Sequence, residues 1–315
     1  LPSPLSFPME ALGESMAHAV ERYGTKLFQY SLTAGIPELR EFIAARCNEK
    51  YGLGVTAADI LITTGSQQAL DLIAKVTLDP GDGVIVEEPG YLGALQTFLQ
   101  YAPTFHPVAL SEDGLDVEGL ASALAAPQVK FIYTVPNFQN PTGLTYSVQN
   151  REAVYHVIRD KNVILIEDDP YGELRFDGKT LPYIAAGRFD NCILLGSFSK
   201  TATPGMRVGY LVCKNAELLE TIAAAKESSD VHTSVLSQYV LYDYLTHNDY
   251  DGHIAEIRAL YESQCKTMLD AMAECFPASV SYTRPDGGMF IWCTLPEGKT
   301  ALDFFYEAVE CKVAV

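Results

Sequence analysis

The sequence predicts an α/β fold with a mostly parallel sheet that helices cover on both faces, followed by a smaller α+β region. Between about residues 60 and 215, short apolar segments of strand length alternate with amphipathic segments of helix length. The apolar segments are continuous, which is typical of strands buried on both faces. After residue 215 the pattern changes to long helical stretches.

The first strand is expected at residues 60–63, and a helix with one apolar face at residues 66–78. The segment Pro80-Gly81-Asp82 ends this helix. Further strands are then predicted at residues 84–87, 131–134, 163–166, 193–195 and 208–212. In folds of this kind ligands collect beyond the carboxyl ends of the strands, so we expect the functional residues there.

The remaining elements lie at the two ends of the chain. Helices are expected around residues 239–244 and 254–273, and strands at 280–282 and 289–292. The first residues contain three prolines and are expected to form an extended arm that runs into a helix. The predicted division is an N-terminal arm (1–25), a large domain (26–245) and a small C-terminal domain (246–315).

Composition excludes several classes of partner. The 315 residues carry a formal net charge of −18, which argues against nucleic acid because phosphate binding needs a basic face. No apolar run approaches the roughly 20 residues of a membrane helix. The seven cysteines are scattered singly and the six histidines are not paired at ligand spacing, so neither a disulfide framework nor a metal site is expected. Unpaired cysteines indicate a reducing compartment, and we expect a cytoplasmic protein.

Lys200 gives the most informative chemical signal. It lies in the string Ser197-Phe198-Ser199-Lys200 after an apolar segment, and Arg207 follows seven residues later. A lysine whose pKa is lowered forms a Schiff base with a carbonyl group, and hydroxyls with a guanidinium are typical phosphate ligands. The string therefore suits an aldehyde that carries a phosphate, such as pyridoxal 5′-phosphate. A solvated lysine after a strand fits the string by itself equally well.

Two turns at predicted strand ends offer further polar groups. In TGSQQ (residues 64–68), the N–H groups of Ser66 and Gln67 at a helix N-terminus suit a phosphate, although Ser66 would equally serve as a helix cap. In NFQNPTG (residues 137–143), Asn140 is held extended by the proline that follows, with its amide free to donate. A turn without a further role is the alternative there.

Acidic and aromatic residues follow two other strands. Three consecutive acids, residues 167–169, come directly after the strand predicted at 163–166. A carboxylate there can pair with a ring nitrogen and keep it protonated, and a helix cap is the alternative. Tyr91 follows the strand predicted at 84–87. Its ring is suited to stack on a planar cofactor, although aromatic side chains more often belong to the core.

Together these motifs resemble those of fold-type-I pyridoxal-phosphate enzymes. The Ser-x-Ser-Lys string with Arg207, the NPTG motif, the pair of Asp168 and Tyr171, and the GSQQAL helix start occur in the family's order. The chain is most similar to class I/II aminotransferases, in the branch of the 2-aminoadipate, kynurenine and aromatic aminotransferases. This resemblance implies a seven-stranded-type sheet in the large domain. The match covers essentially the whole chain and includes the segments 28–31, 34–39 and 285–290.

The resemblance implies a role for each matched residue. Lys200 would bind pyridoxal 5′-phosphate covalently, and Asp168 would pair with its ring nitrogen. Asn140 and Tyr171 would hydrogen-bond the phenolic oxygen, while Tyr91 would stack on the ring. Lys200, Asp168 and Tyr171 would be the catalytic residues. The residues expected to hold the phosphate are Ser66, Gln67, Ser197, Ser199 and Arg207.

The resemblance also implies a dimer and a reaction. Tyr30 would reach the phosphate of the neighbouring subunit, so that homodimers share their active sites. An L-amino acid of aromatic, 2-aminoadipate-like or branched aliphatic type would donate its amino group to a 2-oxo acid, with 2-oxoglutarate as the expected acceptor. The arginine that binds the substrate carboxylate in the family is expected beyond Val315. Relatives also have a helix and a glycine pair before Leu1, so we expect the native polypeptide to extend past both ends.

Two other functions fit the same residues. A carbon–sulfur β-lyase shares nearly every cofactor-binding residue. The effector-sensing half of a transcription regulator also resembles these aminotransferases, but such proteins carry an additional basic DNA-binding domain at the N-terminus.

Overall fold

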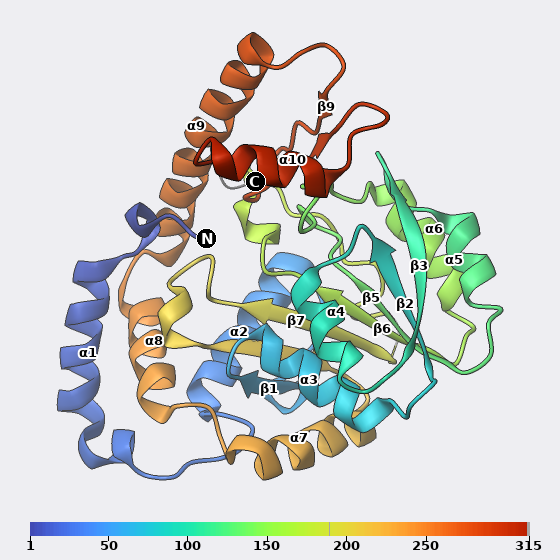
Figure 1. The fold of residues 1–315 in the computed structure, drawn as a ribbon. Coiled ribbons are helices and arrows are strands. Elements are labelled where there is room, and N and C mark those ends of the chain that lie inside the picture. The colour runs from blue at the N-terminus through green and yellow to red at the C-terminus, as the bar shows by residue number, and fades with distance from the viewer. Residues whose placement is uncertain (189, 314–315) are drawn as a thin grey trace.

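The computed structural model describes residues 1–188 and 190–313. Its centre is an eight-stranded, mostly parallel sheet in the order β1-β8-β7-β6-β5-β2-β3-β4, which confirms the predicted fold class (Figure 1). β8 runs antiparallel to both of its neighbours, and β4 antiparallel to β3. The strands are β1 (Ile60–Thr63), β2 (Gly83–Glu88), β3 (Thr104–Ser111), β4 (Gly114–Leu115), β5 (Val129–Thr134), β6 (Ile164–Asp168), β7 (Cys192–Ser197) and β8 (Gly209–Cys213).

Helices cover both faces of this sheet because its strands are apolar on both sides. Within β1, Ile60 and Ile62 belong to a core with α2 and α8, whereas Leu61 lies in the opposite core with α3, α4 and α7. A third hydrophobic core lies on the same face of the sheet as α2 and α8, where α5 and α6 pack against it. The helices are α1 (Met9–Tyr23), α2 (Pro37–Tyr51), α3 (Ser66–Thr77), α4 (Leu92–Leu99), α5 (Val117–Ala123), α6 (Val148–Ile158), α7 (Ala216–Asp230), α8 (Val235–His247), α9 (Tyr250–Cys275) and α10 (Ala301–Glu310).

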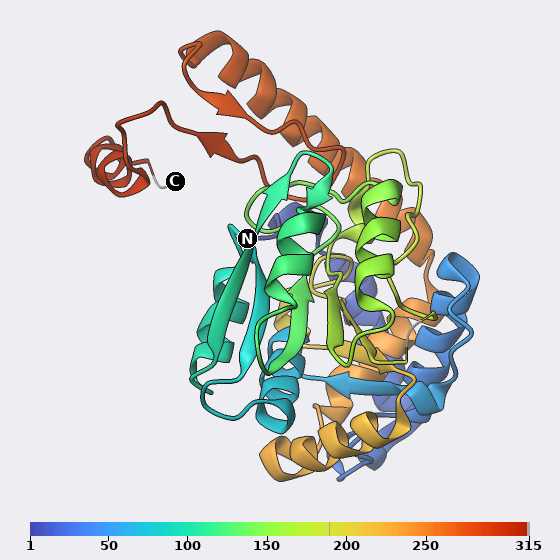
Figure 2. The same cartoon turned by 90° about the vertical axis from the view of Figure 1, so that its right-hand side faces the viewer.

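The two ends of the chain lie outside the layered core. Residues 1–25, expected as an arm, are mostly the helix α1, which lies beside α8 in Figure 1. The long helix α9 leads to a two-stranded sheet of β9 (Ser281–Tyr282) and β10 (Cys293–Thr294) and then to α10. Figure 2 shows this last part projecting beyond one end of the large sheet. Among the described residues, no helix combines the length and the apolar character needed to cross a bilayer.

Three sequence-based expectations differ from the structure. β6 continues through Asp168, so Glu167 and Asp168 lie within the strand rather than after it. The strand predicted at 289–292 is wrong in position, because the strand that pairs with β9 is β10 at Cys293–Thr294. Phe290, which precedes it, packs edge-on against Tyr171, with 5.5 Å between the ring centroids. Neither β3 nor the two-residue edge strand β4 was predicted, and β4 adds an eighth strand to the seven-stranded-type sheet that the resemblance implies. The end of the predicted small domain, residues 314–315, lies outside the described residues.

Candidate active site

The predicted site residues converge on one edge of the sheet because of its topology. Strands β1, β2, β5, β6 and β7 run in the same direction, so the turns that follow them meet at one edge. β8 runs in the opposite direction, so Arg207, which precedes it, reaches the same edge. Ten of the eleven predicted residues therefore gather there, and Tyr30 is the exception.

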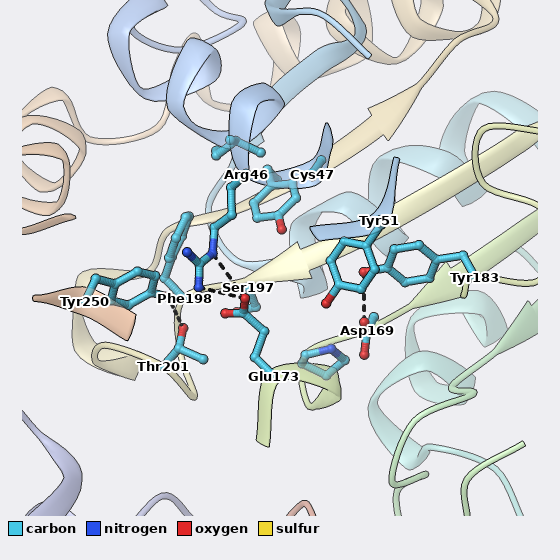
Figure 3. Close-up of a pocket in the computed structure, with 13 residues that line it drawn as sticks. Arg46, Cys47, Tyr51, Asp169, Glu173, Tyr183, Ser197, Phe198, Thr201 and Tyr250 are labelled. Atoms are coloured by element: carbon cyan, nitrogen blue, oxygen red, sulfur yellow. Dashed lines mark hydrogen bonds and ion pairs between the residues drawn. The ribbon is translucent and has the colours of Figure 1, made fainter. Parts of the chain in front are cut away.

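The three acids at the end of β6 have different surroundings. The Glu167 carboxylate accepts the backbone N–H groups of residues 184–186 at 2.7 to 3.0 Å. The Asp169 carboxylate accepts Asn137 Nδ2 at 2.9 Å and the Tyr183 hydroxyl at 2.9 Å, as Figure 3 shows for Tyr183. Asp169 Oδ1 also accepts the backbone N–H of Gly172 at 2.8 Å, at the start of a short 3-10 helix (Gly172–Leu174), so the expected capping role applies to this acid. Both acids are therefore structural.

Asp168 differs from the other two acids because one of its carboxylate oxygens accepts no hydrogen bond from the described residues. The residue is 3 % exposed, and its Oδ2 accepts the Tyr133 hydroxyl at 2.8 Å. Its Oδ1 is buried and has no hydrogen-bond partner among the described residues. Burial raises the pKa of Asp168 to about 7, and the Tyr133 hydroxyl opposes that rise. A buried carboxylate in this state favours a cationic N–H donor, which would satisfy Oδ1 and stabilise the charge.

Lys200 lies in the turn after β7, with its Nζ 6.0 Å from the centroid of the Tyr171 ring. Burial lowers the pKa of Lys200, the Arg207 charge lowers it further, and the Asp168 carboxylate raises it. A lower pKa leaves more of the amine neutral at a given pH, and the neutral amine is the nucleophile that attacks an aldehyde.

The N-terminus of α3 faces a guanidinium. Gly65 is the N-cap residue with φ +78°, and no side chain caps the helix, so the alternative role of Ser66 as the cap is wrong. A Cβ atom at Gly65 would come within 2.5 Å of Arg207 Nη2, so only glycine permits this approach. Among the described residues no carboxylate pairs with Arg207, which is exposed and lies 3.4 Å from the Thr64 carbonyl oxygen. The N–H groups of a helix end without a side-chain cap, together with a guanidinium that has only long contacts to carbonyl oxygens, suit a phosphate.

Two other predicted phosphate ligands differ in which of their hydrogen-bonding groups are available to a phosphate. The Gln67 side chain turns towards α4, where Nε2 donates to the Gly93 carbonyl at 2.9 Å and to the Thr97 hydroxyl. Only its backbone N–H remains for a ligand. The Ser197 hydroxyl accepts the Ser199 N–H at 3.2 Å, which fixes the turn that carries Lys200.

Three further predicted residues surround Asp168. Burial raises the pKa of Tyr91 and of Tyr171, and the negative charge of Asp168 raises both further. The Asn140 amide lies close enough to the Tyr171 hydroxyl to oppose this rise. Tyr30 lies apart, 80 % exposed, with its ring edge-on to His232 at 5.8 Å between centroids.

Sequence reasoning missed Tyr133 and the buried support of the NPTG turn. The Glu87 carboxylate accepts the Val135 N–H at 2.8 Å and Gln139 Nε2 at 2.9 Å. Gln139 Oε1 in turn accepts the Thr142 N–H at 2.9 Å. The only available signal was a glutamate at the end of the apolar run of β2. Burial raises the pKa of Glu87, which favours its protonated form.

A polar cavity of about 40 Å³ adjoins the site (Figure 3). It is large enough for about three waters at roughly 10–15 Å³ each. Arg46 of α2 reaches across it to Glu173 with an N–O distance of 2.8 Å. The lining includes Asp169 and Ser197 but not Asp168, Lys200 or Arg207. The cavity therefore lies among the residues that support the site and not among its reactive groups.

Three features of the site fit an aldehyde-bearing pyridine phosphate. The free Oδ1 of Asp168 fits a protonated ring nitrogen, and the amine of Lys200 fits an aldehyde. The uncapped end of α3 beside Arg207 fits a phosphate.

Comparisons with known proteins agree with this geometry. The family model described as aminotransferase class I and II matches residues 6–315. The chain is 38 % identical to aromatic-amino-acid aminotransferase 1 of Thermococcus litoralis, over 95 % of this chain and 73 % of that protein. The structure of α-aminoadipate aminotransferase from Thermus thermophilus, complexed with N-(5′-phosphopyridoxyl)-L-leucine, is similar with a TM-score of 0.93 and 37 % identity, covering 100 % of this chain and 80 % of that one. The kynurenine aminotransferase of Pyrococcus horikoshii gives a TM-score of 0.94 and 39 % identity, covering 100 % and 79 %.

Proposed function

Because the chain belongs to the class I and II aminotransferases and is a pyridoxal-phosphate-dependent transaminase, we propose that Lys200, Asp168 and Tyr171 are its catalytic residues. We further propose an L-amino acid with an aromatic, 2-aminoadipate-like or branched aliphatic side chain as the donor, and 2-oxoglutarate as the acceptor. Relatives with aromatic, aminoadipate and kynurenine substrates in their names support this donor class.

When bound, the cofactor supplies an aldehyde that takes up the amino group and a ring that withdraws electrons from the substrate carbon. Asp168 holds a proton on the ring nitrogen, and the free buried Oδ1 is the single observation that carries this role. Lys200 Nζ would hold the aldehyde of the cofactor, and once the amino group of the substrate has displaced it, the free amine would be the base for the substrate's α-proton, for which its lowered pKa suits it.

The remaining proposed residues bind and orient. Asn140 and Tyr171 hydrogen-bond the ring hydroxyl, and the Tyr91 ring stacks on the pyridine face. The phosphate is held at the N-terminus of α3 and by the turn after β7, and the residues proposed for it are Ser66, Gln67, Ser197, Ser199 and Arg207.

We propose that the protein is a cytoplasmic homodimer in which Tyr30 completes the phosphate site of the neighbouring subunit. The exposed position of Tyr30, away from its own site, supports this arrangement.

We also propose that the chain is divided into an arm (1–25), a large cofactor domain (26–245) and a small domain (246–315). These assignments rest on the family and on the exposure of Tyr30.

An assay of both half-reactions tests the proposed reaction. A panel of aromatic, aminoadipate and branched amino acids is incubated with the holoprotein and 2-oxoglutarate, and glutamate is measured. We expect glutamate to form only with an amino donor present. Pyruvate released from cysteine-type substrates without any oxo-acid acceptor would instead indicate a β-lyase.

A further inference from the structure

Polar side chains of α7 hold the turn that carries Gly65 and Ser66. The Lys226 side chain is completely buried, and its Nζ donates to both carboxylate oxygens of Asp230, at 2.7 and 2.8 Å. Asp230 Oδ2 in turn accepts Gln68 Nε2 at 2.6 Å and the Thr64 hydroxyl at 3.2 Å. The ion pair on α7 is therefore bonded to both ends of the turn between β1 and α3.

Gln68 closes the network. Its Oε1 accepts Lys226 Nζ at 3.2 Å and the Thr64 backbone N–H at 2.8 Å. Both the N–H and the hydroxyl of Thr64 are thereby fixed, while its carbonyl oxygen lies 3.4 Å from Arg207 Nη2. Thr64 thus connects the pair on α7 to the two components of the phosphate site, the uncapped helix end and Arg207.

The stability of the fold does not by itself explain why the Lys226 ammonium group is buried. Taking an ammonium group out of water is costly, and a buried pair often adds no net stability over apolar residues of similar size. Burial lowers the pKa of Lys226, and its bonds to Asp230 oppose that effect. Lys226 also offsets a carboxylate that would otherwise lie uncompensated near an anion-binding helix end.

We propose that Lys226 and Asp230 are positioning residues for the phosphate of the cofactor, acting through Gln68 and Thr64. The inference rests on the proposed function, because it assumes that the N-terminus of α3 and Arg207 hold this phosphate. The pair touches neither the ring nor the aldehyde, so its effect is confined to ligands that carry a phosphate.

The test compares pyridoxal 5′-phosphate with pyridoxal, which lacks the phosphate. The full chain is freed of cofactor, and the dissociation constants of both aldehydes are measured for the wild type and for the double variant Lys226→Met, Asp230→Ala. Removing both charges avoids leaving one buried and unpaired. We expect the dissociation constant of the phosphate ester to rise about tenfold, as for the loss of one charge-assisted bond, with that of pyridoxal unchanged.

Two further variants sharpen the comparison. Lys75→Met removes a contact between the same two helices, Lys75 Nζ to Ser229 Oγ at 3.1 Å, and should leave both dissociation constants unchanged. Thr64→Val removes only the hydroxyl bond to Asp230 and the contact with Thr233, and should weaken the phosphate ester selectively but less.

An equal loss for both aldehydes, or no loss for either, would overturn the proposal. If the double variant is too unstable to assay, the dissociation constants of the two aldehydes are compared for Thr64→Val instead. An equal loss for both, or no loss for either, would again overturn the proposal. A wild-type chain that binds neither aldehyde would contradict the proposed function itself, which separates the two failures.

Discussion

At the residue scale, the site depends on one carboxylate that its neighbours leave unsatisfied. Glu167 and Asp169 are saturated by backbone and side-chain donors, whereas Asp168 keeps a buried oxygen free. The cost of burying that charge raises the pKa of Asp168 to about 7. In the proposed site, the pyridinium N–H of the cofactor would offset this desolvation cost, which would favour cofactor binding.

We expect Asp168→Asn to raise the free energy of unfolding of the cofactor-free protein by an amount that depends on pH. Because the folded pKa of about 7 lies above the unfolded value of 3.8, ionisation destabilises the fold increasingly between these pH values. The free energies of unfolding of the variant and the wild type should be equal near pH 4. Above pH 7 that of the variant should be higher by a few kcal/mol, because each unit by which the pKa is raised corresponds to about 1.4 kcal/mol. Urea unfolding at several pH values measures the difference.

Asp270, exposed on α9, provides the control for that series. Asp270→Asn should change the free energy of unfolding by no more than about 0.5 kcal/mol at any of these pH values. A gap between Asp168→Asn and the wild type that stays constant with pH would contradict the assignment of the raised pKa.

At the element scale, the start of α3 combines a missing cap with a close approach. Gly65 has φ +78° and ψ 167°, a region that only glycine adopts readily, and its position leaves room for Arg207. The helix end and the guanidinium then face the same space. We therefore propose that the start of α3 binds the phosphate at the point where most helices place a capping side chain.

Gly65→Ala should weaken cofactor binding more than it weakens the fold. The new methyl would displace Arg207, so we expect the affinity for pyridoxal 5′-phosphate to fall at least about tenfold, as for a lost bond to a charged group. The strained backbone should cost about 1–3 kcal/mol of stability. Gly52→Ala is the matched control, because Gly52 also has a positive φ but open space around it. The control should lose stability without losing cofactor affinity, and equal losses of affinity in both variants would contradict the role of Arg207.

The sequence predicted the layered elements well because each depends on a local pattern. Continuous apolar runs placed six strands of the large sheet to within about two residues at each end. The strand predicted at 289–292 begins only at Cys293, and the residues before it pack against the large domain, as Phe290 does against Tyr171. The same limit applies within the site. The direction of the Gln67 side chain and the bond from Tyr133 to Asp168 depend on neighbouring elements that no local pattern reveals.

At the scale of the whole molecule, the proposed dimer makes each active site depend on two chains. Tyr30 is 80 % exposed, and its ring lies edge-on to His232. Tyr30→Phe should therefore weaken cofactor binding, and Lys200→Ala should abolish covalent attachment. Hybrids of the two variants should regain one intact site per dimer, formed by Lys200 of one chain and Tyr30 of the other. Cofactor titration of purified hybrids measures this recovery, and hybrids that bind no better than Tyr30→Phe would rule out shared sites.

In the proposed site, Lys200 is the residue to which pyridoxal 5′-phosphate attaches. The most direct measurement is borohydride reduction of the holoprotein, followed by mass spectrometry of its peptides. We expect a single phosphopyridoxyl label on the peptide that contains Lys200, and none in Lys200→Ala. A label on another lysine, such as Lys214 after β8, or no label on the wild-type protein would contradict the claim.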